Sequence, residues 1–181
     1  MSRIGDWIQT FSGVEFYPLD PRPDEIRIED IAHALSMQCR YSGHVRRFYS
    51  VAEHSIRVAD MCHPDHALWG LLHDASEAYL VDLPGPLKHH SDIGRLYREA
   101  EEKLMKAVCE RFGLAWPVPE PVARVDKAML WFEARDLMPH HPYWEKWMTL
   151  TTGVEFSVEQ TMPAEVAEQM FLTRFGQLKG F

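Results

Sequence analysis

Prolines, glycines and other turn residues divide this sequence into a series of separate helical segments. The chain holds 12 prolines and 10 glycines. Between them, apolar residues recur at the three- and four-residue spacing of one helix face. The alternation typical of strands is almost absent, although a short ribbon within residues 41–49 stays open. The sequence therefore predicts an all-α fold built as a single helical bundle.

Capping residues and breakers set the ends of the expected helices. Ser50 and Glu53 form a capping box, Asp65 caps the following segment, and Gly113 ends a long amphipathic one. Irregular stretches are expected at residues 16–23, 39–49, 117–121 and 139–142. The expected helices span residues 28–38, 50–64, 67–80, 91–112, 121–138 and 158–174.

Length and charge narrow the class of protein. The 181 residues predict one domain, residues 1–181, and a hydrophobic fraction of 46% excludes disorder. We expect a cytoplasmic protein, because no apolar run approaches a membrane span and the N-terminus lacks a secretory signal. A net charge of −8 argues against nucleic-acid binding but leaves room for a small phosphorylated substrate. The three cysteines are expected to be reduced thiols.

Histidines and acids fall on apolar helix faces, where they need a partner. His54 lies on the inward face of its helix, although a lone histidine there is usually structural. His73, Asp74 and Glu77 crowd one turn of an apolar segment. A salt-bridge cluster is the alternative, but no Lys or Arg lies between residues 58 and 87. Asp126 joins the inner face of a later helix, and a cation would explain this second acid as well.

Two imidazoles and two carboxylates form a metal-ligand set. His54, His73, Asp74 and Asp126 supply two nitrogen and two oxygen ligands from three helices. Such a set suits one divalent transition metal (Co, Mn, Zn, Ni or Fe) better than calcium. It would also leave coordination positions for water and for a substrate oxygen.

The pattern H…HD…D resembles that of the HD-domain metal-dependent phosphohydrolases. The string VAEHS at residues 51–55 and HDASE at 73–77, followed by DLPGPLK at 82–88, resemble the signature of bacterial 5′-deoxynucleotidases. The similarity covers about residues 28–138, the expected core of the domain. Residues 16–23 and 39–49 look closest to small HD phosphohydrolases of bacteria and phages, which include dATP triphosphohydrolases. The resemblance thus implies a bacterial cytoplasm, or a host cytoplasm for a phage protein.

The resemblance also implies roles for residues outside the metal set. Glu77 would handle the proton of the attacking water or the leaving group, and Asp82 would orient water or protonate the 5′ oxygen. A loop cap is the alternative for Asp82. Arg22 is a weaker candidate for phosphate binding, and His89 and His90 are expected at a solvated helix start. The expected substrate-binding residues are Lys88, Arg40 and His44 for phosphate, and Phe16, Tyr17 and Pro18 for the base, unless their loop simply packs on the core.

Together with this metal-ligand set, the resemblance implies a metal-dependent hydrolase that cleaves deoxynucleotides at the α-phosphorus. A dNTP, foremost dATP, is the first expected substrate, giving deoxynucleoside and triphosphate. A 5′-deoxynucleotidase acting on dNMPs is the alternative, and a non-catalytic nucleotide-binding HD module is a second one. The expected partners are the small-molecule nucleotide and further copies of the chain in a homo-oligomer, with no nucleic acid and no membrane.

Overall fold

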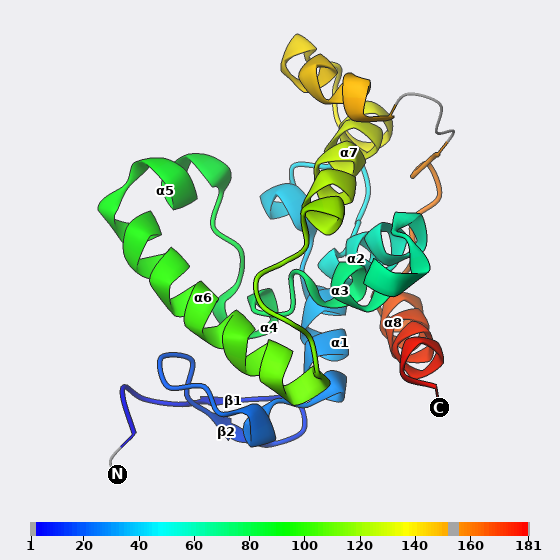
Figure 1. The fold of residues 1–181 in the computed structure, drawn as a ribbon. Coiled ribbons are helices and arrows are strands. Elements are labelled where there is room, and N and C mark those ends of the chain that lie inside the picture. The colour runs from blue at the N-terminus through cyan, green and yellow to red at the C-terminus, as the bar shows by residue number, and fades with distance from the viewer. Residues whose placement is uncertain (1–2, 152–155, 181) are drawn as a thin grey trace. The chain divides into compact units, whose positions relative to one another are not determined.

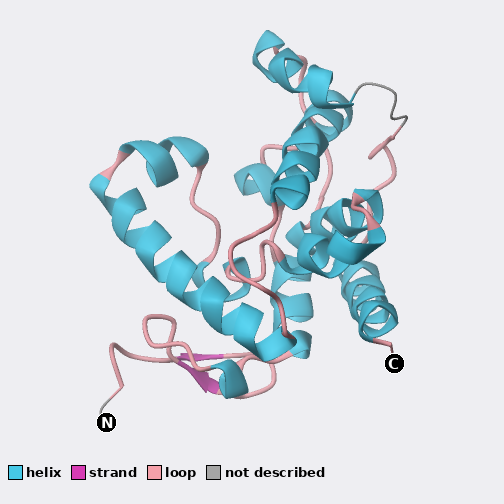
Figure 2. Ribbon diagram, viewed as in Figure 1, coloured by secondary structure: helices cyan, strands magenta, loops and turns pink. Residues whose placement is uncertain are grey.

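The computed structural model describes residues 3–151 and 156–180, and most of them are helical (Figure 1). Helices make up 64% of the structure and strands 3%, which confirms the all-α prediction (Figure 2). Among the described helices, none is both long enough and apolar enough to cross a membrane.

The chain folds into two compact units, each made of two separate stretches of sequence. The first unit comprises Met1–Leu35 and Asp74–Pro117, and the second comprises Ser36–His73 and Val118–Phe181. Helix α1 (Ile28–Met37) crosses the first boundary, and the second boundary falls at the bond between His73 and Asp74.

The first unit packs a small hairpin and short helices around one long helix. In the hairpin, β1 pairs antiparallel with β2, and Ile8 faces Phe16. The Phe16 ring is fully buried and stacks on Tyr79 with 4.0 Å between ring centroids. A Cβ on Gly94 would come within 2.2 Å of the Leu87 carbonyl oxygen, so glycine permits the close approach of α5 to α6. The elements are β1 (Ile8–Gln9), β2 (Glu15–Phe16), η1 (Pro23–Glu25), α4 (Glu77–Leu80), α5 (Gly85–His90) and α6 (Asp92–Phe112).

The second unit is a group of helices centred on α2, which contacts α3, α7 and α8. Ser50 caps α2 as expected, because its side chain accepts a hydrogen bond from the Glu53 N–H at 3.0 Å. The Glu53 carboxylate does not complete the capping box; it accepts from Arg57 and from the Met162 N–H instead. The elements are η2 (Arg40–Gly43), α2 (Val51–Met61), η3 (Pro64–His66), α3 (Ala67–Leu72), α7 (Glu120–Leu137), η4 (Pro142–Thr151) and α8 (Ala164–Lys179).

The single helix expected over residues 67–80 is interrupted after Leu72. Residues 73–76 form turns, and the Glu77 N–H donates to the Asp74 carbonyl three residues back at 3.0 Å. This tighter winding turns successive side chains by about 120° instead of 100°. The turn therefore redirects His73, Asp74 and Glu77 relative to α3, which the helical periodicity did not predict.

The last helix also differs from its expected position at residues 158–174. It begins at Ala164 because Pro163 precedes it, and a residue before proline is disfavoured in a helix. Upstream of this proline, the N–H groups of Val158 and Met162 donate to the Asp136 and Glu53 carboxylates instead of to a helix. Residues 41–49, where a ribbon was left open, begin within a short turn at Arg40–Gly43, and one isolated bridge joins Cys39 to Ser50 on either side of this stretch.

Candidate metal centre

Two imidazoles meet at the contact between α2 and α3. His54 lies on α2 with its side chain fully buried, and His73 directly follows α3. Their Nε2 atoms are 3.2 Å apart. Gly70 permits this proximity, because a Cβ there would lie 2.9 Å from the Cα of Ala59 on α2. The lack of a side chain at Gly70 therefore allows α2 and α3 to come close enough for the two histidines to meet.

The neighbours of each imidazole determine which nitrogen carries the proton. His54 Nδ1 lies 2.6 Å from Glu133 Oε1, and His73 Nδ1 lies 2.7 Å from the Gly70 carbonyl oxygen. Both partners are acceptors, so both Nδ1 atoms carry the hydrogen. The two Nε2 atoms then face each other, and their contact is a hydrogen bond when one of them is also protonated.

Asp126 adds a negative charge to the same point. Its Oδ1 lies 3.3 Å from His54 Nε2 and 3.8 Å from His73 Nε2. Burial raises the pKa of Asp126, but its hydrogen bonds to the two imidazoles outweigh this and hold the pKa well below the ordinary value. Two Nε2 atoms and one carboxylate at these distances repel each other unless a proton or a metal ion lies between them. A proton on one Nε2 relieves part of this repulsion, whereas a metal ion engages all three atoms at once.

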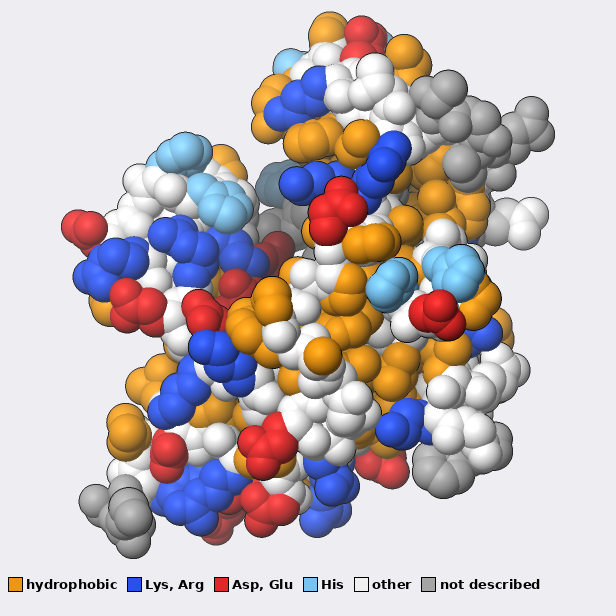
Figure 3. All heavy atoms as spheres, in the orientation of Figure 1, with side chains coloured by type: hydrophobic (Ala, Val, Ile, Leu, Met, Phe, Trp, Pro, Cys, Tyr) orange, Lys and Arg blue, Asp and Glu red, His pale blue; other side chains and the backbone are white. Residues whose placement is uncertain are grey.

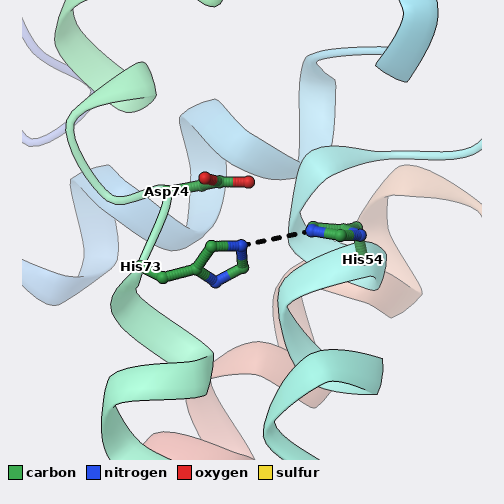
Figure 4. Close-up of side chains that lie close together, drawn as sticks. All are labelled: His54, His73 and Asp74. Carbon is green, nitrogen blue, oxygen red and sulfur yellow. Dashed lines mark hydrogen bonds between the residues drawn. The ribbon is translucent and has the colours of Figure 1, made fainter. Parts of the chain in front are cut away.

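Asp74 offers a further ligand beside the histidines. His54, His73 and Asp74 each have a ligand atom within 4.8 Å of the others, and within the described residues this group could hold a metal ion. Figure 4 shows the imidazoles pointing toward each other with the Asp74 carboxylate beside them. The side chain of Asp126 is 35% exposed, so one side of the centre is open to water. Nitrogen and oxygen donors with an open side fit a catalytic divalent transition metal.

Glu133 is a component of the site that sequence reasoning missed. Its side chain on α7 is fully buried, and its carboxylate contacts His54 Nδ1. Burial raises its pKa, but the positive charge of Arg40 and the contact with His54 lower it to about 2. A signal was present, because Glu133 follows Asp126 by two helical turns and so shares its face of α7.

Arg40 and His44, both expected to bind phosphate, differ in environment. The Arg40 guanidinium donates to Glu133 Oε2 from Nε at 3.2 Å and from Nη2 at 3.1 Å. His44 is exposed, and its backbone N–H donates to the Tyr41 carbonyl. Phosphate binding by either residue stays a prediction.

The first unit contains the remaining expected catalytic and phosphate-binding side chains. Lys88 Nζ lies 2.8 Å from Glu101 and 3.8 Å from Asp82. Burial lowers the pKa of Lys88, but Glu101, Asp82 and Glu77 together raise it above its ordinary value. Figure 3 shows Lys, Arg and His side chains gathered over α5 and α6, the helices that carry Lys88 and Glu101. The sequence did not predict a role for Glu101. Its carboxylate forms an ion pair with the Lys88 ammonium, the group that was expected to bind phosphate.

The backbone immediately before Asp82 is strained. Val81 has a φ of 58°, which is the left-handed region that a β-branched residue avoids. The Tyr97 hydroxyl donates to the Val81 carbonyl at 2.5 Å and so stabilises this conformation. Strain of this kind is concentrated at functional sites.

The expected base-binding loop is packed within the first unit. Phe16 is fully buried, as described above, and the Arg3 guanidinium lies 4.1 Å from the centre of the Tyr17 ring. Pro18 is half-buried. The sequence left open the alternative that this loop packs on the core, and Phe16 does so. Base binding by this loop stays a prediction.

Comparison with known proteins places the chain in a family. No family model matches the sequence. The chain is 38% identical to the Uncharacterized protein YfdR of Escherichia coli (strain K12), over 95% of this chain and 95% of YfdR. The chain belongs to the YfdR family.

Two further relatives extend this comparison beyond YfdR itself. An uncharacterized protein of Rhodobacter capsulatus is 40% identical, over 67% of this chain and 66% of that protein. A 5′-deoxynucleotidase of Vibrio atlanticus is 33% identical, over 35% of this chain and 43% of the enzyme. One protein to which this chain is similar therefore carries the name of a nucleotide hydrolase.

Proposed function

We propose that this chain is a metal-dependent phosphohydrolase that cleaves deoxynucleotides between the 5′ oxygen and the α-phosphorus. The observation that carries the proposal is the convergence of two imidazole Nε2 atoms and the Asp126 carboxylate at one point, a donor set that suits a divalent cation. The similarity to a 5′-deoxynucleotidase supports the class of substrate.

The proposal gives each residue of the site a role in the reaction. A divalent metal ion held by His54, His73, Asp74 and Asp126 would supply a Lewis acid for the phosphoryl group and a water of lowered pKa. Glu77 takes the proton of the attacking water, which adds to phosphorus as the bond to the 5′ oxygen breaks. The leaving 5′ oxygen takes a proton from Asp82, and Lys88 binds the phosphate oxygens.

Monophosphates and triphosphates share this scissile bond, so both remain substrates of the proposed reaction. A dNMP would yield deoxynucleoside and phosphate, and a dNTP would yield deoxynucleoside and triphosphate. The name of the Vibrio relative favours the monophosphate. The preference for dATP rests on the resemblance of residues 16–23 and 39–49 alone.

A screen of dNMPs, dNTPs and NTPs with Co, Mn, Zn, Ni or Fe added tests the proposal, with products separated by chromatography. We expect turnover that EDTA abolishes and that Asp126→Asn lowers at least about 100-fold, since the metal supplies most of the charge stabilisation. Glu120→Gln is the matched control, because this exposed acid begins the same helix.

Three results would contradict the proposal. They are full activity in EDTA, an active Asp126→Asn variant, and tight nucleotide binding that yields no product with any metal. The last result would indicate a nucleotide-binding module instead. Circular dichroism of each variant separates a lost site from a lost fold.

A further inference from the structure

Glu133 is surrounded by hydrogen-bond donors. Its carboxylate accepts from the Tyr41 hydroxyl at 2.6 Å, from the Tyr49 hydroxyl at 3.0 Å and from the Arg40 guanidinium, and it faces His54 Nδ1 at 2.6 Å. The side chain has no exposed surface. Burying a carboxylate costs several kcal/mol unless it is fully paired. This degree of pairing indicates that the negative charge is needed at this position.

A second buried glutamate in the same unit shows what an ordinary structural ion pair looks like. Glu53 is also fully buried and pairs with Arg57 at 2.5 Å. Its remaining hydrogen bond comes from the Met162 N–H, which attaches the segment before α8 to α2. Within the part of the chain that the structure describes, no imidazole is among the hydrogen-bond partners of Glu53, although it directly precedes His54. The contact with an imidazole therefore distinguishes Glu133 from Glu53.

The loop that supplies the donors to Glu133 adopts a costly conformation. Tyr41 and Ser42 have φ angles of 54° and 52°, which non-glycine residues rarely adopt. In this conformation Arg40 and Tyr41 both contact Glu133, and the oxygen they share is Oε2. Oε1 remains for His54 and Tyr49. The loop thus stabilises the face of the carboxylate that points away from the imidazole.

We propose that Glu133 is a positioning residue that makes His54 a stronger metal ligand. Its Oε1 accepts the Nδ1 proton of His54, which fixes the ring orientation, leaves Nε2 as the ligand atom and raises the basicity of that nitrogen. Arg40, Tyr41 and Tyr49 act one step further out, because they hold the carboxylate in place. This inference rests on the proposed metal site and names a residue that site depends on.

The experiment measures metal affinity rather than turnover. The metal-free protein is titrated with Co(II) against a chromophoric chelator, and the visible absorption of bound Co(II) reports its ligand geometry. We expect Glu133→Gln to weaken binding by about 10–100-fold and to change the Co(II) spectrum. Glu53→Gln is the matched control, and it should lower thermal stability while keeping the wild-type affinity and spectrum. Equal effects of the two variants would overturn the proposal.

Glu133→Asp is a second variant, which keeps the test valid if Glu133→Gln fails to fold. It keeps the charge beside Arg40 but is one methylene shorter, so the carboxylate should lose its contact with His54 and the affinity should again fall. A folded Glu133→Asp protein with wild-type affinity would overturn the proposal.

A measurement on the unmutated protein needs no variant. In ¹⁵N NMR spectra of the zinc-loaded chain, we expect the His54 Nδ1 to carry a proton and its Nε2 to bind zinc. The opposite arrangement would overturn the inference. If the unmutated protein binds no metal at all, the proposed function itself fails, and this outcome is distinct from the others.

Discussion

At the scale of single residues, the chemistry of an ionisable side chain depends on the groups that contact each of its polar atoms. His54 has Glu133 on Nδ1 and His73 on Nε2, so one nitrogen faces a carboxylate and the other faces a second imidazole. Arg40 illustrates the same principle, because its contacts with Glu133 assign it to the support of a carboxylate. From the sequence, Arg40 was expected to bind phosphate, and its contact with Glu133 was not predicted.

Asp136 allows a residue-scale prediction about pH. Its carboxylate pairs with Arg135 and accepts from the Val158 N–H at 2.8 Å. Burial raises its pKa, but these interactions lower it below the ordinary value of 3.8. The charge therefore stabilises the fold above about pH 4, and this contribution is lost as the pH falls through the lowered pKa. Asp136→Asn should cost about 1 kcal/mol of unfolding free energy at pH 7.

Urea unfolding of both proteins at several pH values tests this sign. The difference between wild type and Asp136→Asn should be constant from pH 7 to pH 5 and should shrink below pH 4. A difference that grows toward acid would show that the folded state does not favour the charged form of Asp136.

At the scale of elements, the close contact of α2 and α3 brings the two imidazoles together. Ala59 on α2 lies against Gly70 on α3, and the Cys62 sulphur is also near Gly70. The chain then leaves the regular helix at His73, so the imidazole projects from a turn. Helix packing and a local change of winding both contribute to the position of the His73 imidazole.

Substituting Gly70 tests the importance of this contact. In Gly70→Ala the new methyl group would meet the Ala59 backbone at 2.9 Å, and that backbone cannot move away as a flexible side chain could. We expect a loss of about 1–3 kcal/mol in unfolding free energy, measured by urea denaturation, together with weaker Co(II) binding. Gly176→Ala is the matched control, because nothing lies within 4 Å of a Cβ at that helical position. Wild-type Co(II) affinity in Gly70→Ala would show that α2 and α3 need not approach so closely.

At the scale of the whole molecule, each unit is assembled from segments far apart in the sequence. The second unit joins residues 36–73 to residues 118–181. His54 and His73 come from its first segment, and Asp126 and Glu133 come from its second. An ion bound at this point would link both segments of the unit. The expected association of copies of the chain remains a prediction.

This assembly predicts that metal binding stabilises the folded chain. A ligand that binds only the folded state stabilises it by about 2.7 kcal/mol at 100 times its dissociation constant. Adding Co(II) or Zn(II) to the metal-free protein should therefore raise the Tm measured by calorimetry, and EDTA should reverse the change. Asp126→Asn should show little or no shift. A metal-independent Tm in the wild type would argue against a site that joins the two segments.

The sequence by itself determined most of the helices and the helix faces on which His54 and Asp126 lie. Periodicity and capping residues act over a few residues, so they predicted the helix at Asp92–Phe112 within one residue and assigned His54 and Asp126 to inward faces. Only the tertiary structure decided which faces meet. Glu133 lies 79 residues from His54 along the chain, and no local pattern specifies a contact over that separation. Residues 73–76 likewise contain no proline or glycine, so no local signal predicted the turn at His73.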